Sequence, residues 1–158
     1  MQKKTITFCV AAVLFLASVA HGGPQESANS SLRKFDEFGN INCEDELARL
    51  DSFAIELQNR STLRGYIIIY GGRHGRRNEA KARAARMKYY LVHSRGLDKT
   101  RIITLDGGYR ESVMGELWLS QSGTPAPTPT PTVRAMDITL KGRVRVYGYN
   151  CGDAMGRL

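Results

Sequence analysis

The sequence predicts an α+β domain whose elements follow in the order strand, helix, strand, helix, strand, strand. Three observations lead to that order: a helical repeat that opens with acids, an uncharged β-branched run closed by two glycines, and an alanine-rich segment with apolar residues at helical spacing. The chain has 158 residues, enough for one domain with a buried core. We expect that domain to occupy residues 32–121.

The first strand and helix are predicted by local signals. Residues 32–38 alternate weakly and precede Gly39 and Asn40, which predicts a short strand followed by a turn. Asn42 offers an N-cap, and the three acids after it suit the positive end of a helix dipole. Leucine and alanine then repeat every three or four positions, so a helix is expected over residues 43–59.

The second half of the domain repeats this alternation. Residues 66–70 read Tyr-Ile-Ile-Ile-Tyr, an uncharged run typical of a covered central strand. The alanine-rich segment 78–95 predicts the second helix, which Gly96 ends. Strands are expected over residues 101–105 and 113–119, with an Asp-Gly-Gly turn after the first of them.

The start of the chain carries an export signal. Lys3 and Lys4 precede an apolar run that ends in small residues, the layout of a secretory signal peptide, here expected over residues 1–22. The run is shorter than a membrane-spanning helix needs, so no transmembrane segment is expected in the mature chain; a retained anchor helix is the alternative. Residues 23–31 are interpreted as a flexible leader. We therefore expect a periplasmic or secreted protein.

The C-terminal part differs in composition from the domain. Prolines and threonines alternate along much of residues 122–132, which forbids helix and predicts an extended linker. Beyond it, residues 138–140 and 144–149 predict a short hairpin or one bent edge strand. This β tail, residues 133–158, is too small to fold alone and is expected to pack on the main domain.

Removal of the signal leaves two cysteines, Cys43 and Cys151. In an oxidising compartment a disulfide between them is the natural hypothesis, and it would tether the tail; two buried, unpaired cysteines are the alternative. Their spacing is not that of metal ligands, so no metal is expected. The glycine-rich loop lacks the lysine and hydroxyl of a P-loop, so no cofactor is expected either.

The most informative segment is the loop Gly-Gly-Arg-His-Gly-Arg-Arg at residues 71–77. Glycines allow close backbone approach, and exposed amides at the start of a helix favour an anion. From Arg73 to Lys88 there are seven basic side chains and one acid. Guanidinium groups bind carboxylate or phosphate by two-point contact. The predicted ligand-binding residues are Gly71, Gly72, Arg73, His74, Arg76, Arg77, Arg83 and Arg86. A solvated basic helix face is the alternative.

The net charge and the kinds of side chain present limit the classes of partner and of chemistry that the chain could have. Loss of the signal removes Lys3 and Lys4 and lowers the formal net charge from +8 to +6, which favours acidic partners. Export makes nucleic acid the least expected of these. His74 and His93 are the candidates for proton transfer, but no nucleophile motif accompanies them, so no enzyme is expected. The remaining enzymatic alternative would use the loop on a phosphorylated substrate.

Several short sequence motifs, and the order in which they occur, are similar to those of a known family. They are Phe35-Asp36-Glu37-Phe38, the apolar strand ending in Gly71, Arg83-Ala84 with Met87 and Tyr90-Leu91-Val92, and Gly96-Leu97-Asp98 with Arg101-Ile102. In these segments residues 32–119 resemble the OmpA-like peptidoglycan-binding domain family. The resemblance implies a βαβαββ two-layer sandwich, with two helices on one face of a mixed sheet, that holds the peptide stem of peptidoglycan noncovalently.

In that family an aspartate after the second strand and an arginine in the following helix grip the diamino-acid end of the stem. The resemblance puts Arg83 at the arginine position, while His74 stands about where the aspartate is expected. Without the aspartate, the arginines would repel an ammonium group and attract carboxylates or phosphates. We expect a cell-envelope module that binds peptidoglycan or another anionic wall polymer. The alternative is an envelope protein–protein interaction module that has lost glycan binding.

Overall fold

The computed structural model describes residues 31–145, so the predicted signal peptide, nearly all of the leader and Cys151 lie outside the described residues. The predicted order of elements is confirmed. The elements are β1 (Leu32–Phe38), α1 (Cys43–Asn59), β2 (Leu63–Gly72), α2 (Glu79–Tyr89), a π-helical turn η1 (Tyr90–Ser94), β3 (Ile102–Arg110), β4 (Met114–Gln121) and a 3-10 turn η2 (Ala135–Asp137).

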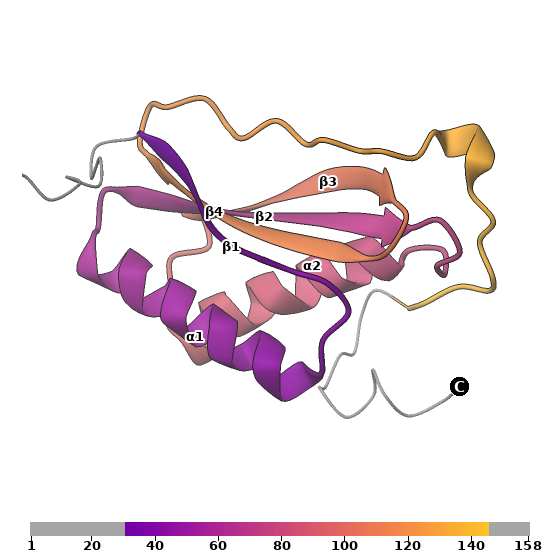
Figure 1. The fold of residues 1–158 in the computed structure, drawn as a ribbon. Coiled ribbons are helices and arrows are strands. Elements are labelled where there is room, and N and C mark those ends of the chain that lie inside the picture. The colour runs from indigo at the N-terminus through magenta and orange to yellow at the C-terminus, as the bar shows by residue number, and fades with distance from the viewer. Residues whose placement is uncertain (1–30, 146–158) are drawn as a thin grey trace, which may run out of the picture.

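The four strands form one mixed sheet in the order β1-β4-β2-β3. β4 runs antiparallel to both β1 and β2, whereas β2 and β3 are parallel and joined through α2. Both helices pack on the same face of the sheet (Figure 1). The chain is therefore an α+β protein with two helices and a four-stranded mixed sheet, an arrangement compatible with a two-layer sandwich.

The hydrophobic core lies between the sheet and the two helices. Its large, fully buried members come from both helices, η1 and the strands β2, β3 and β4: Leu50, Phe53, Leu57, Ile67, Ile69, Met87, Leu91, Ile102, Leu117 and Leu119. Burial of each such side chain contributes about 1.5–3 kcal/mol. α1 approaches β2 closely because Gly65 has no side chain: a Cβ there would lie 2.8 Å from the Phe53 ring.

Local signals explain where the helices begin and how the second one ends. The Asn42 side chain accepts a hydrogen bond from the backbone N–H of Asp45 at 2.8 Å, which caps α1. Asn78 precedes α2 in the left-handed region, at φ 66°. The single helix predicted over residues 78–95 is an α-helix only to Tyr89, after which η1 adds one wider turn.

The Pro/Thr-rich segment covers the face of the sheet that the helices leave free. Residues 122–132 run extended across that face (Figure 1). The backbone N–H of Thr130 donates to the Tyr70 hydroxyl at 3.1 Å, and that of Thr132 donates to the Tyr109 carbonyl at 2.9 Å. The segment predicted as a linker is extended as expected, and it packs against the domain.

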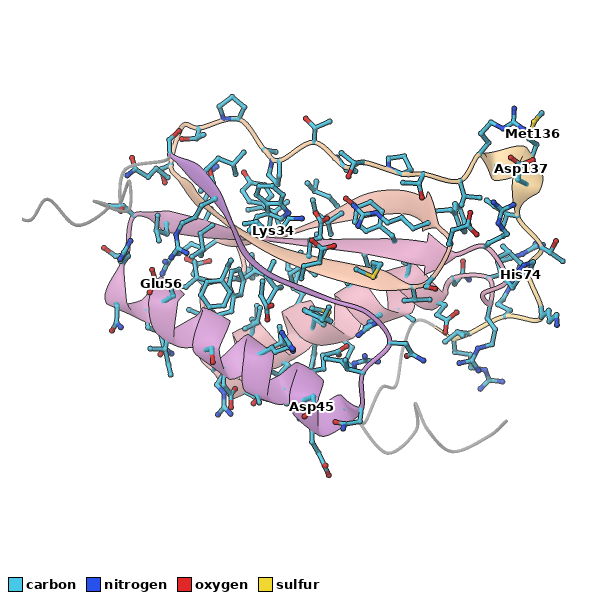
Figure 2. The ribbon with its side chains drawn as sticks, in the orientation of Figure 1. Lys34, Asp45, Glu56, His74, Met136 and Asp137 are labelled. Atoms are coloured by element: carbon cyan, nitrogen blue, oxygen red, sulfur yellow. The ribbon has the colours of Figure 1, made fainter. Side chains whose placement is uncertain are left out.

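A buried carboxylate lies beneath this segment. Glu116 of β4 is only 2% exposed and accepts hydrogen bonds from Lys34, Tyr70, Arg110 and Trp118 at 2.9 to 3.3 Å. Figure 2 shows Lys34 on this side of the sheet. Burial alone would raise the pKa of Glu116, but the hydrogen bonds from Trp118, Lys34 and Arg110 hold it below its usual value.

Two predictions about strands are wrong. The predicted turn at residues 106–108 is part of β3, because Gly108 adopts φ 71° and a register shift between Ile69 and Gly71 absorbs the irregularity. Residues 138–140 form no strand and pair instead with the loop after β2. Backbone hydrogen bonds run from Thr139 to Arg73 at 2.9 Å and from Lys141 to Gly75 at 3.0 Å. The other predicted strand, residues 144–149, lies mostly outside the described residues.

Within residues 31–145, no helix combines the length and apolar character that crossing a membrane requires.

Candidate functional site

The structure separates the predicted ligand-binding residues into two groups. Arg83 and Arg86 project from α2 toward Glu46 of α1. Nε of Arg83 and Nη2 of Arg86 each lie 2.6 Å from a different oxygen of that carboxylate. Arg83 is 7% exposed and Glu46 2%. Arg83, predicted together with the loop at residues 71–77 to bind a ligand, is instead buried in an ion pair with Glu46.

Further contacts fix this buried cluster in place. Nη2 of Arg83 donates to the Gly39 carbonyl at 3.1 Å, and its guanidinium lies 5.3 Å from the centre of the Phe38 ring. Burial lowers the pKa of Arg86, while the Glu46 carboxylate acts in the opposite direction. The cluster joins α1 to α2. Because Glu46 already pairs with the guanidinium groups of Arg83 and Arg86, these groups are not free for a ligand.

The loop after β2 is tied down by its own contacts. Arg73 forms a two-point ion pair with Glu111, at 2.6 and 2.8 Å, and this hydrogen bonding raises the pKa of Arg73 and lowers that of Glu111. Nη2 of Arg76 lies 3.6 Å from Glu79. His74 is exposed at the end of the molecule that also holds Asp137 (Figure 2).

A cleft of about 880 Å³ opens between α2 and β3. Four predicted residues, Gly71, Gly72, Arg76 and Arg77, line one end of it, whereas Arg73 and His74 do not. The rest of the lining was not predicted. It includes Lys81, Lys88, Tyr89, Val92 and His93 from α2 and η1, Lys99 from the following loop, and Thr104, Leu105, Asp106 and Tyr109 from β3.

The cleft carries an excess of positive charge. Five cationic side chains line it against two carboxylates: Arg76, Arg77, Lys81, Lys88 and Lys99 against Glu79 and Asp106. Both carboxylates already accept backbone hydrogen bonds at 2.9 Å, from Arg76 and Gly108. Among residues 31–145, the side chains of Arg77, Lys81 and Lys88 form no hydrogen bond or ion pair. These three are available to an anion.

The far end of the cleft is aromatic. Tyr89 is 62% exposed and stacks on His93, with ring centroids 4.2 Å apart and planes at 30°. The π-helical turn begins directly after Tyr89, and such turns are frequent at functional sites. The sequence offered one signal for this surface: Lys81 and Lys88 are seven residues apart, which places both on one face of a helix.

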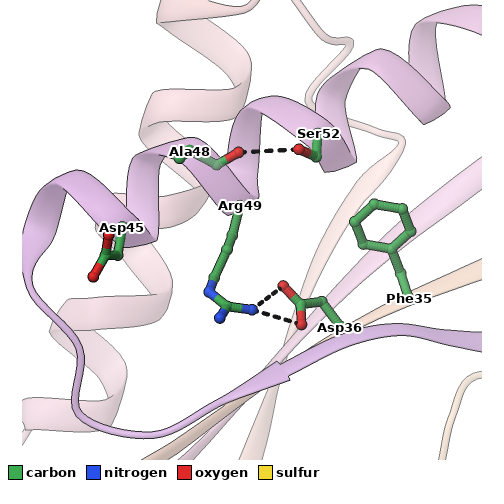
Figure 3. A pocket seen from close by; sticks show the side chains of 6 residues that line it. All are labelled: Phe35, Asp36, Asp45, Ala48, Arg49 and Ser52. Carbon is green, nitrogen blue, oxygen red and sulfur yellow. Dashed lines mark hydrogen bonds and ion pairs between the residues drawn. The ribbon is translucent and has the colours of Figure 1, made fainter.

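A second hollow, of about 580 Å³, lies between β1 and α1 and is lined by Phe35, Asp36, Asp45, Ala48, Arg49 and Ser52. Figure 3 shows Arg49 and Asp36 pointing toward each other. Nη1 of Arg49 lies 2.8 and 2.7 Å from the two oxygens of Asp36. Because these charges neutralise each other, this hollow offers a weaker attraction to an ion than the cleft does.

Other candidate chemistry is limited in the part of the chain that the structure describes. Residues 31–145 contain no group of three or more histidine, cysteine or acidic side chains placed to hold a metal. Cys43 is buried in the first turn of α1, and its proposed partner lies outside the described residues, so the disulfide stays a prediction.

Comparison with protein-family models, curated proteins and solved structures gives no match. Function is therefore inferred from the fold and from the cleft between α2 and β3.

Proposed function

We propose that this chain is an exported cell-envelope binding module of the OmpA-like type. It associates noncovalently with peptidoglycan or another anionic wall polymer through the cleft between α2 and β3. The observation that supports this most strongly concerns three cationic side chains in that cleft, Arg77, Lys81 and Lys88, which form no hydrogen bond or ion pair within residues 31–145.

The ion pair between Arg83 and Glu46 affects which chemical group of a ligand the chain could bind. In the family that the sequence resembles, this arginine helps to grip the diamino-acid end of the stem peptide. Here Glu46 already occupies Arg83 and Arg86, at 2.6 Å each. The cleft is lined by five cationic side chains and two carboxylates, so its net charge favours an anion over an ammonium group. Carboxylates or phosphates of the polymer are therefore the groups that the chain would contact.

Repetition along a polymer would compensate for weak single contacts. Lys81 and Arg77 are exposed, and exposed ion pairs contribute only about 0–1 kcal/mol each and are screened by salt. A polymer with many anionic groups rebinds from the same chain, which raises the overall avidity. Binding is therefore expected to weaken steeply as salt rises.

Sedimentation with purified peptidoglycan tests the proposal. Lys81→Glu reverses one unpaired charge in the cleft, and Arg64→Glu makes the same charge change at an exposed position near the start of β2. We expect wild type and Arg64→Glu to pellet alike at low salt, and Lys81→Glu to pellet severalfold less. Equal pelleting of the two variants would rule out the cleft, and failure of the wild type to pellet would rule out wall binding.

The second candidate function is a module that contacts another envelope protein. The observation that favours it is the outer edge of β3, which borders the cleft and ends the sheet. Cross-linking in the native cell would separate the two functions, because a protein partner gives a discrete adduct and a wall polymer does not.

A further inference from the structure

The two edges of the sheet differ in how they are protected. β1 carries the charged residues Arg33, Lys34, Asp36 and Glu37, and its register shifts between Lys34 and Asp36. Charges and bulges of this kind prevent an edge strand from pairing with another chain. β3 instead begins Ile-Ile-Thr-Leu, four residues without a charge or a proline.

Within the described part of the chain, no strand pairs with the outer side of β3 over these residues. β2 is its only neighbour in the sheet, and elsewhere in residues 31–145 it forms one isolated antiparallel bridge, from Tyr109 to Val133. The Arg101 carbonyl accepts from the N–H of Gly65 at 2.9 Å, on the side of β2. Because backbone groups alternate along a strand, those of Thr104 point to the outer edge.

The cleft lies along the same strand. Thr104, Leu105 and Asp106 line it from β3, and Lys81 and Lys88 line it from α2. A strand added outside β3 would therefore have unpaired ammonium groups close to one of its faces. Its other face would lie beside Ile103, which is apolar and half-buried.

We propose that an extended, acidic segment of another protein pairs with the outer edge of β3 and places its carboxylates in the cleft. This inference shares with the proposed function only the use of the same cleft. It differs in that the bound molecule is a polypeptide. Charge complementarity favours this partner over a second copy of the chain, because two copies joined at β3 would bring like charges together. The matching segment alternates acidic and apolar residues, since successive side chains of a strand face opposite sides.

Fluorescence anisotropy with a labelled peptide tests this inference. The probe is a capped peptide of about six residues in which glutamate and valine alternate, a typical strand length. The matched probe has lysine in place of every glutamate. Thr104→Pro removes an amide from the outer edge, where proline is tolerated, without removing a hydrogen bond inside the sheet. Lys81→Glu tests the charge, and Arg64→Glu is the control for it.

The acidic peptide is expected to bind wild type and Arg64→Glu, and to bind Thr104→Pro and Lys81→Glu at least about tenfold more weakly, a change of 1.4 kcal/mol or more. The lysine peptide is expected to bind none of them. If Thr104→Pro fails to fold, Lys81→Glu and the lysine peptide decide the outcome. Equal binding of the two peptides, or undiminished binding by folded Thr104→Pro, would overturn the proposal.

Two further arms separate this inference from its rivals. If peptidoglycan pellets the protein while the acidic peptide does not bind, the proposed function stands and the peptide inference fails; the reverse result supports the peptide inference and overturns wall binding. Light scattering of the free protein tests the second copy. A dimer that Thr104→Pro dissociates would make this chain its own partner and overturn the inference.

Discussion

Replacement of Glu46 by glutamine removes the negative charge from the cluster that joins α1 to α2. Glu46 accepts three hydrogen bonds from the two arginines, at 2.6, 3.0 and 2.6 Å. Glutamine has nearly the same size but is neutral and keeps one carbonyl oxygen. Arg83, at 7% exposure, would then hold a buried positive charge without its counterion.

Removal of one partner from a buried ion pair costs about 3–5 kcal/mol, because the remaining charge stays desolvated. Two arginines share this carboxylate, so we expect Glu46→Gln to lower the free energy of unfolding by about 4 kcal/mol. That is a large part of the roughly 5–15 kcal/mol typical of a folded domain. For a chain of this size it corresponds to a fall in Tm of roughly 15 °C.

Urea unfolding of the mature protein, followed by circular dichroism, measures this loss. Glu44→Gln is the matched control, because it is the same substitution in the same first turn of α1, at a side chain that is exposed. We expect the control to lose less than about 0.5 kcal/mol. Equal unfolding midpoints for the two variants would refute the reasoning, because Glu46 would then not be the buried counterion of Arg83.

Two further predictions concern groups away from the cleft. Hydrogen bonds hold the pKa of Glu116 below 4.5 in the folded protein, so the stability that this carboxylate contributes is complete above pH 4.5 and is lost as the pH falls through the folded pKa. Glu116→Gln should therefore flatten the fall in unfolding free energy at acid pH. An unchanged fall would contradict this. The mature protein, denatured without reductant, should show no free thiol, and Cys43→Ser should leave one; two thiols in the wild type would exclude the disulfide with Cys151.

The order of the elements could be predicted because each carries its signal locally. The Asn42 cap and the acids after it mark the start of α1, and the β-branched run of β2 marks the centre of the sheet. The end of β3 could not be predicted, because Asp-Gly-Gly is a common turn sequence. In this chain Gly107 packs against Tyr70, where a Cβ would approach within 2.7 Å, and the strand continues.

The site was harder to predict because it depends on contacts between distant segments. Glu46 reads locally as a first-turn acid that suits the helix dipole, yet it is the counterion of Arg83, a residue 37 positions away. The basic residues of α2 therefore lie on two different faces of the helix. Arg83 and Arg86 face α1, while Lys81 and Lys88 face β3. A count of charges along the sequence cannot show which face each one occupies.

An NMR titration of the mature protein with soluble peptidoglycan fragments tests the central claim most directly, because backbone amide shifts report the contact surface residue by residue. The proposal predicts shifts that cluster at the amides of Arg77, Lys81, Lys88 and Thr104. Shifts confined to the hollow around Asp36 and Arg49, or to the surface around Lys34, would contradict it and place the binding surface elsewhere on the molecule.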